Sequence, residues 1–166
     1  TADITPLPPP ELHWPITQVP GEWLIGFHPA EIEAGRTFRW SYPVAGIDLP
    51  LSAGEYEITI DCGGIRPWPG SLRWSLDGQT VPSHALKYEP EVCRLRVRIE
   101  AARRASRRTL GLACLPWDVS DTRRLGLPIF DITCRRLDSP AAAANPARFP
   151  ESPSSERESS GQRRAA

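Results

Sequence analysis

Several short stretches of this sequence alternate apolar and polar residues with a period of two. The clearest are EYEITIDC (55–62), SLRWSLDG (71–78) and CRLRVRIE (93–100). Successive side chains of a β-strand point to opposite faces, so each stretch predicts a strand with one buried and one solvated face. Strands of this kind are typical of antiparallel sheets.

Further candidate strands fill most of the chain between residues 21 and 138. They are EWLIGF (22–27), TFRWSY (37–42), VAGIDL (44–49), QTVP (79–82), RTLGLACL (108–115) and GLPIFDITC (126–134). Asp77-Gly78 suits a tight hairpin turn, and only EAARRASRR (100–108) could form a helical turn, or equally a long loop tip. Eight or nine short strands with Pro, Gly, Asp and Ser turns predict an all-β, antiparallel, jelly-roll-like β-sandwich.

The two ends of the chain differ in composition from this central part. Residues 1–20 contain six prolines, which predicts an extended lead-in. Residues 139–166 have almost no apolar pattern, which predicts a disordered tail. We therefore place the β-sandwich domain at residues 21–138.

Charge and targeting signals narrow the partners and the compartment. The chain has 20 basic and 20 acidic residues, so it has no general attraction for nucleic acid or anionic membrane. Arginine outnumbers lysine 19 to 1, which reflects either GC-rich coding or an oxyanion site. No transmembrane segment or signal peptide is evident. The sequence contains no methionine, and we therefore expect a processed chain or a piece of a longer protein.

Four cysteines occur at wide spacing and without a CxxC pair, so no metal site is expected. Each is in phase with the apolar face of a candidate strand, which predicts buried thiols that act as core hydrophobes. Sparing use of cysteine suggests a reducing compartment and hence a cytoplasmic protein, although disulfides stay open. The cysteines are Cys62, Cys93, Cys114 and Cys134.

No catalytic set can be assembled from the sequence. There is no GxSxG elbow, phosphate-binding loop or dinucleotide motif, and no cofactor is predicted. Histidines and neighbouring acids in loops are more often surface or turn residues than catalytic groups. The candidates are His13, His28, His84 and the pairs Glu31/Glu33 and Asp118/Asp121. An enzymatic role, such as a small carbohydrate-active hydrolase, is the least supported alternative.

Tryptophan is abundant, and two of the six tryptophans stand in predicted loops. Trp68 in RPWPG and Trp117 in LPWDVSD could stack on a sugar ring, with Arg66 and Asp121 as polar partners. The alternative is that both indoles cap the ends of the sandwich. Trp40 and Trp74 are in strand phase and are expected in the core.

Three pieces of the chain, taken in order, resemble a known family. They are GFHPAE followed by TFRWSY, the LDG hairpin, and D-x-R-x-LG before the last strand. Together they resemble the β-sandwich accessory domains of bacterial glycosyltransferases of cell-surface polysaccharide biosynthesis. The matching positions are Gly26, Phe27, Glu31, Gly35, Phe38, Arg39, Trp40, Asp121, Arg123, Leu125 and Gly126.

The resemblance implies a non-catalytic module that contacts a glycan or a partner glycosyltransferase, and a purely structural interaction domain is the alternative. The motif residues are expected to be structural: Phe38 and Trp40 in the core, Arg39 and Ser41 outward, and Glu31 paired with Arg39. Asp121 is also expected to pair with Arg123 or Arg124 and to fix a turn. Gly126 is expected to allow a close approach that a side chain would prevent.

The apolar phase slips within GLPIFDITC. Leu125, Leu127 and Ile129 are at odd-numbered positions, whereas Phe130 and the later apolar residues are at even-numbered positions. Such a slip beside a proline predicts a bulge or a strand entrance that is covered on both sides.

Overall fold

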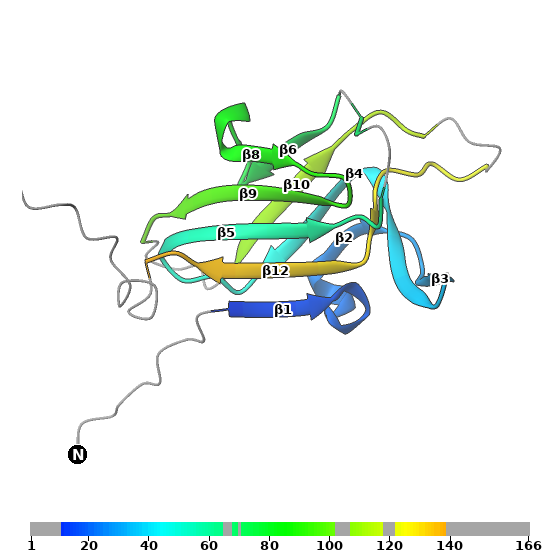
Figure 1. The fold of residues 1–166 in the computed structure, drawn as a ribbon, viewed down its shortest axis with the longest axis horizontal. Helices are drawn as coiled ribbons and strands as arrows, with labels where there is room; N and C mark the ends of the chain where they lie inside the picture. Colours follow the sequence, from blue (N-terminus) through cyan, green and yellow to red (C-terminus); the bar gives the residue numbers. More distant parts are fainter. Residues whose placement is uncertain (1–10, 65–67, 70, 102–106, 118–121, 139–166) are drawn as a thin grey trace, which may run out of the picture.

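A computed structural model describes residues 11–64, 68–69, 71–101, 107–117 and 122–138 (Figure 1). The fold is an antiparallel β-sandwich, which confirms the predicted all-β class. Two sheets face each other, and their strands cross at an angle in the view of Figure 1. The described residues contain twelve strands, more than the eight or nine predicted, because several are only two or three residues long.

The five-stranded sheet has the order β1-β12-β5-β9-β8. Its strands are β1 (Glu11–Pro15), β5 (Gly54–Asp61), β8 (Leu86–Tyr88), β9 (Val92–Ile99) and β12 (Asp131–Arg136). The seven-stranded sheet has the order β11-β4-β10-β6-β7, with β2 and β3 also paired to β4. Its strands are β2 (Leu24–Phe27), β3 (Glu31–Glu33), β4 (Arg36–Leu49), β6 (Arg73–Leu76), β7 (Gln79–Thr80), β10 (Arg108–Ala113) and β11 (Pro128–Ile129).

Three short 3₁₀ turns complete the described elements: η1 (Ile16–Gln18), η2 (Gly21–Trp23) and η3 (Ser83–Ala85). The chain passes from one sheet to the other repeatedly, for example between β4 and β5, between β5 and β6, and between β9 and β10. This connectivity is typical of jelly-roll sandwiches.

The core lies between the inward faces that the alternation predicts. Ile58, Ile60, Leu95 and Leu110 are almost fully buried, and Trp74 fills the space between the sheets, as expected. The Asp77-Gly78 hairpin is also confirmed: β6 and β7 pair across it, and both residues have positive φ angles, 48° and 82°. Such angles are those of a type I′ turn.

The sandwich begins earlier than the predicted residue 21. β1 pairs with β12, and Ile16 and Val19 are buried in the main core. The prolines in this segment led to the prediction of an extended lead-in. An edge strand forms ladder hydrogen bonds on one side only and therefore tolerates proline. The predicted tail at 139–166 lies outside the described residues, as do residues 102–106 of the helical turn or loop tip predicted at 100–108.

The phase slip in GLPIFDITC marks a change of sheet. β11 pairs with β4 in one sheet, and β12 pairs with β5 in the other. The side chains of Ile129 and Phe130 are both buried, on opposite sides of the chain as it crosses. The prediction of a strand covered on both sides is confirmed at this crossing.

Two strands predicted as separate form one. Residues 37–42 and 44–49 belong to the single long strand β4, which continues through Pro43. Pro43 still contributes an acceptor, because its carbonyl oxygen accepts a hydrogen bond from the Cys114 backbone at 2.8 Å. β4 therefore carries partners from β2, β3, β10 and β11 along its length.

Candidate functional site

The outer face of the five-stranded sheet is polar, as the alternation predicts. β5 presents Glu57 and Thr59, which lie opposite Arg96 and Arg94 of β9. On its other side, β5 places Glu57 opposite Arg135 of β12. Acidic and basic side chains thus occupy neighbouring strands, where cross-strand pairs stabilise the sheet.

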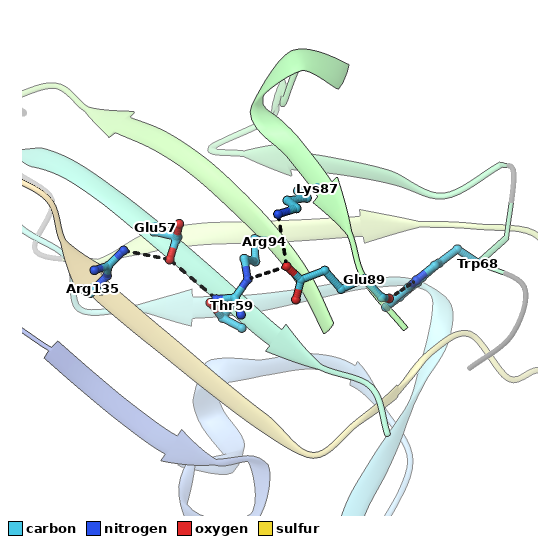
Figure 2. A network of polar contacts seen from close by, with 7 residues as sticks. All are labelled: Glu57, Thr59, Trp68, Lys87, Glu89, Arg94 and Arg135. Atoms are coloured by element: carbon cyan, nitrogen blue, oxygen red, sulfur yellow. Dashed lines mark hydrogen bonds and ion pairs between the residues drawn. The ribbon is translucent and has the colours of Figure 1, made fainter. Parts of the chain in front are cut away.

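Arg94 is the centre of a polar network on this face (Figure 2). Its Nε donates to Glu89 Oε1 at 3.3 Å, and its Nη1 donates to Thr59 Oγ1 at 3.3 Å. The same Nη1 lies 3.7 Å from Glu57 Oε1. The guanidinium is therefore held in one orientation from three sides.

Both acids of this network also have a second cationic partner. Arg135 donates to Glu57 at 3.1 Å, and Lys87 Nζ lies 3.4 Å from Glu89. The hydrogen bond from Arg94, followed by its charge and that of Lys87, lowers the pKa of Glu89 below its ordinary value. Glu89 therefore stays ionised through neutral pH.

A groove of about 580 Å³ runs beside this network, within the roughly 300–1,000 Å³ range of small-molecule pockets. It lies where the short strand β8 runs beside the longer β9: β8 pairs only with residues 93–95, and His84 and Ala85 of η3 line the groove together with Arg96. The lining residues are Glu57, His84, Ala85, Leu86, Lys87, Glu89, Arg94, Leu95 and Arg96.

Trp68, a predicted ligand residue, is joined to this network. Its indole Nε1 donates to the Glu89 backbone carbonyl at 2.7 Å, and its ring lies 5.1 Å from the Tyr88 ring. Figure 2 shows Trp68 beyond Glu89, at the end of the row that includes Lys87 and Arg94. The side chain is half-buried and packs against the main core.

Trp117, the other predicted tryptophan, lies against different partners. Its ring is 6.4 Å from that of Trp40 on β4, and its backbone nitrogen donates to Leu125 at 3.0 Å. Its indole nitrogen is buried and has no hydrogen-bond partner among the described residues. Arg66 and Asp121 lie outside the described residues, so the ligand roles of all four stay predictions.

The structure brings together residues from the two ends of the family-like motif. Arg123 Nη1 donates to Glu31 Oε2 at 2.8 Å, and Nη2 donates to Glu31 Oε1 at 3.4 Å. The expected Glu31–Arg39 pair is wrong for a geometric reason. Glu31 is opposite Phe38 in the ladder, so its side chain shares the face of Phe38 and not that of Arg39.

The expected facing of the β4 residues also needs correction. Phe38 is buried, but it stacks on Phe130 in an aromatic cluster outside the main core, and Trp40 packs edge-on against it. Ser41, expected outward, is fully buried. Its hydroxyl accepts from the Leu127 nitrogen at 2.9 Å and donates to the Tyr42 carbonyl at 2.8 Å.

Two of the three motif glycines, Gly26 and Gly126, occupy positions where a side chain would clash with the backbone. Gly26 has φ 73° at the β2 irregularity, and a Cβ there would lie 2.8 Å from the Val44 carbonyl. A Cβ on Gly126 would lie 2.3 Å from Ser41 Oγ and 2.4 Å from the Tyr42 carbonyl oxygen. The expected close approach at Gly126 is confirmed.

A second polar cluster ties the β3–β4 hairpin to the five-stranded sheet. Asp61 and Asp131 face each other across β5 and β12. Arg36 Nη2 bridges them, at 2.7 Å from Asp61 and 3.3 Å from Asp131, and its guanidinium lies 4.3 Å from the centre of the Phe130 ring. The hydrogen bond to Asp61 raises the pKa of Arg36, so the bridge stays charged.

The histidines do not share one site. His28 is buried, stacks on Tyr42 at 4.1 Å and bonds the Arg124 carbonyl at 3.0 Å. His13 lies 3.3 Å from Asp131, and His84 lines the groove. Of these, only His84 lies at the groove.

The predicted core role of the cysteines is confirmed for Cys62, Cys93 and Cys134, whereas Cys114 is only partly buried and lies outside the main core. All four are free thiols, and three are buried in the main core. Burial raises the pKa of Cys93 and of Cys134 to about 12. These thiols therefore remain protonated and behave as small apolar side chains.

The described residues contain neither a metal-binding cluster nor a membrane-spanning helix. No three His, Cys, Asp or Glu side chains within them are grouped closely enough to hold a metal ion. The helices in this part of the chain are all too short to cross a membrane.

Sequence reasoning did not find the groove residues. The outward direction of Arg94 and Arg96 follows from the alternation of CRLRVRIE. The pattern does not show that β8 is short, or that Lys87 and Glu89 lie beside Arg94. The one sequence feature that could have indicated the groove is the short strand that follows the PSH turn (82–84).

Comparisons with known proteins identify no family. No protein-family model matches the chain, and no curated protein sequence matches it. Among solved structures, a family 35 carbohydrate-binding module from Clostridium thermocellum is similar at TM-score 0.39 and 8% sequence identity. The alignment covers 75% of this chain and 90% of that module. At this level of similarity, the ligand of that module is not carried over to this chain.

Proposed function

We propose that this chain is a non-catalytic β-sandwich module that binds a glycan in the groove beside β8 and β9. The observation that carries the proposal is the fixed guanidinium of Arg94, held by Glu89 and Thr59 at the groove wall. Planar guanidinium and carboxylate groups match the paired hydroxyls of a sugar, as donor and acceptor respectively. Because the network already orients them, binding costs little side-chain entropy.

The charges that line the groove favour an acidic glycan. Its cations are Lys87, Arg94 and Arg96, and its acids are Glu57 and Glu89. Both acids already have two cationic neighbours, whereas Arg96 has no ion-pair partner among the described residues. A ligand carboxylate near Arg96 would supply the missing partner.

The proposal is tested by calorimetric titration of the protein with oligosaccharides. The panel contains neutral chains and chains with uronic acids. We expect Arg94→Ala to weaken binding about tenfold or more, since a hydrogen bond to a charged group contributes about 1.5–3 kcal/mol. Binding of the acidic chains should also weaken with salt, because the attraction is screened.

Arg98→Ala is the matched control. Arg98 is on the same strand and the same face, but it is largely exposed, pairs only with exposed Glu100 and does not line this groove. The Arg98→Ala variant should keep the wild-type affinity for oligosaccharides and the wild-type melting temperature. If no oligosaccharide binds the wild type, or if both variants lose binding equally, the glycan proposal is wrong.

We also propose that the module works beside a glycosyltransferase of bacterial cell-surface polysaccharide assembly in the cytoplasm. Support comes from the family-like motif, whose two ends meet at the Glu31–Arg123 pair. Glycosyltransferase genes next to this one, or a catalytic domain in the same reading frame, would favour this association. A gene neighbourhood without sugar enzymes would count against it.

A further inference from the structure

Exposed apolar side chains gather on one face of the molecule. The described residues include six large hydrophobic side chains that are exposed. Three of them lie on β2 and β4 of the seven-stranded sheet, and a fourth follows the end of β10. They are Ile25, Tyr42, Val44 and Leu115, with exposed fractions of 57%, 42%, 72% and 69%. Single exposed hydrophobics are ordinary, but a cluster on one side of a sheet marks an interaction surface.

The strand register shows that these residues are neighbours. Val44 on β4 is opposite Ala113 on β10, and Ile25 on β2 is opposite Gly46, two residues further along β4. The hydrogen bond from the Cys114 nitrogen to the Pro43 carbonyl extends the β4–β10 pairing by one residue. Leu115 follows directly, just past the end of β10, and its nitrogen donates to the Ser71 hydroxyl. We call Ile25, Tyr42, Val44, Ala113 and Leu115 the apolar face.

Small residues keep the surface beside the apolar face flat. Gly46 and Gly111 are opposite each other in the ladder, and Ser75 follows on β6. The Ser75 hydroxyl occupies the space over Gly111, since a Cβ there would lie 2.4 Å from it. A flat sheet face suits another protein surface, whereas a small ligand needs a concave site.

Charge at the edge of the apolar face indicates the partner's chemistry. Arg73 is opposite Ala113, is exposed and has no hydrogen bond or ion pair to any described residue. The nearby acids are engaged: Asp48 accepts from Thr109 Oγ1 at 2.6 Å, and Asp77 accepts from the Thr109 nitrogen at 2.9 Å and from Arg108 at 3.4 Å. The charge directly beside Val44 and Ala113 is therefore that of Arg73, whereas Asp48 lies four residues further along β4.

We propose that the apolar face is the docking surface for a different protein, one with an apolar patch bordered by a carboxylate that meets Arg73. A second copy of this chain is a poorer match, because the charged residue beside its own Val44 and Ala113 is again Arg73. This surface lies on the opposite sheet from the groove, so the proposal stands independently of the glycan site.

The test places a photo-crosslinking benzoylphenylalanine at Val44 in the full chain, expressed in its source organism. The matched control places it at Ile32, which is 74% exposed but lies on β3, outside the apolar face. We expect an adduct with one other protein from Val44 and none from Ile32. The crosslinked peptide should be apolar and carry Asp or Glu.

Binding of that purified protein then decides the chemistry. Arg73→Glu should weaken it about tenfold or more, because like charges would face each other, and exchange of the partner's acid for lysine should restore it. Three results would overturn the proposal: no Val44 adduct above the Ile32 control, an adduct only between two copies of this chain, or unchanged binding by Arg73→Glu.

Discussion

At the scale of single residues, close packing decides which side chains are tolerated. Gly126 lies against the Tyr42 carbonyl and the Ser41 hydroxyl, and its own nitrogen donates to the Ser41 carbonyl at 2.7 Å. Its neighbour Leu127 bonds the hydroxyl of the same serine. This glycine therefore lets the segment before β11 approach β4 closely enough to hydrogen-bond.

We predict that Gly126→Ala lowers the free energy of unfolding by about 1–3 kcal/mol or more, because a Cβ would collide with backbone atoms. Urea denaturation followed by tryptophan fluorescence measures the change. Gly21→Ala is the control, since nothing lies within 4 Å of a Cβ built there. Equal stability of Gly126→Ala and wild type would show that this approach is not needed.

At the scale of elements, the edge of the five-stranded sheet is built from a segment whose composition suggests an extended lead-in. β1 and η1 together place Ile16 at zero exposure in the main core, and its nitrogen donates to the Phe130 carbonyl at 2.8 Å. The period-two pattern of ELHWP spans one short strand, too few residues to outweigh the surrounding prolines. Only the pairing partner β12 reveals the strand.

Ile16→Ala should accordingly lower the free energy of unfolding by about 2–5 kcal/mol, through lost burial and the cavity it leaves. Thermal and urea unfolding of the full chain measure this loss. Ile32→Ala removes the same atoms from an exposed position on β3, so its effect should stay within about 0.5 kcal/mol. Similar effects of both substitutions would place residues 11–19 outside the cooperative fold.

At the scale of the whole molecule, the two candidate surfaces lie on opposite sheets. The groove belongs to the outer side of β8 and β9, and the apolar face belongs to the outer side of β2, β4 and β10. Figure 1 shows these strands in the front and back layers of the sandwich. A module of this shape can hold a glycan on one side and a protein on the other.

Separate surfaces predict separable losses. Arg94→Ala should weaken oligosaccharide binding and leave crosslinking from Val44 unchanged. Arg73→Glu should weaken the protein partner and leave oligosaccharide affinity within twofold, because its side chain projects from the other sheet. Calorimetry and crosslink yield on each variant provide the readouts. Loss of both activities in either variant would mean that the sites are not independent.

The sequence by itself determined those features that depend on near neighbours in the chain. Alternation assigned the outward direction of Arg94 and Glu57 and the burial of Cys62, Cys93 and Cys134, because a strand repeats every two residues. Asp77-Gly78 predicted its hairpin, because the required backbone angles depend on those two residues. The phase slip before Phe130 predicted a bulge or a strand entrance covered on both sides, and the structure shows that the chain changes sheet there.

Only the tertiary structure decided how distant segments meet. Glu31 pairs with Arg123 across 92 positions, and Trp68 reaches Glu89 across 21, and no local pattern specifies either partner. The groove is lined by η3, β8 and β9, and the apolar face is built where β2 and β10 flank β4. Each depends on strand order and register, which are set by packing of the whole core and not by any one segment.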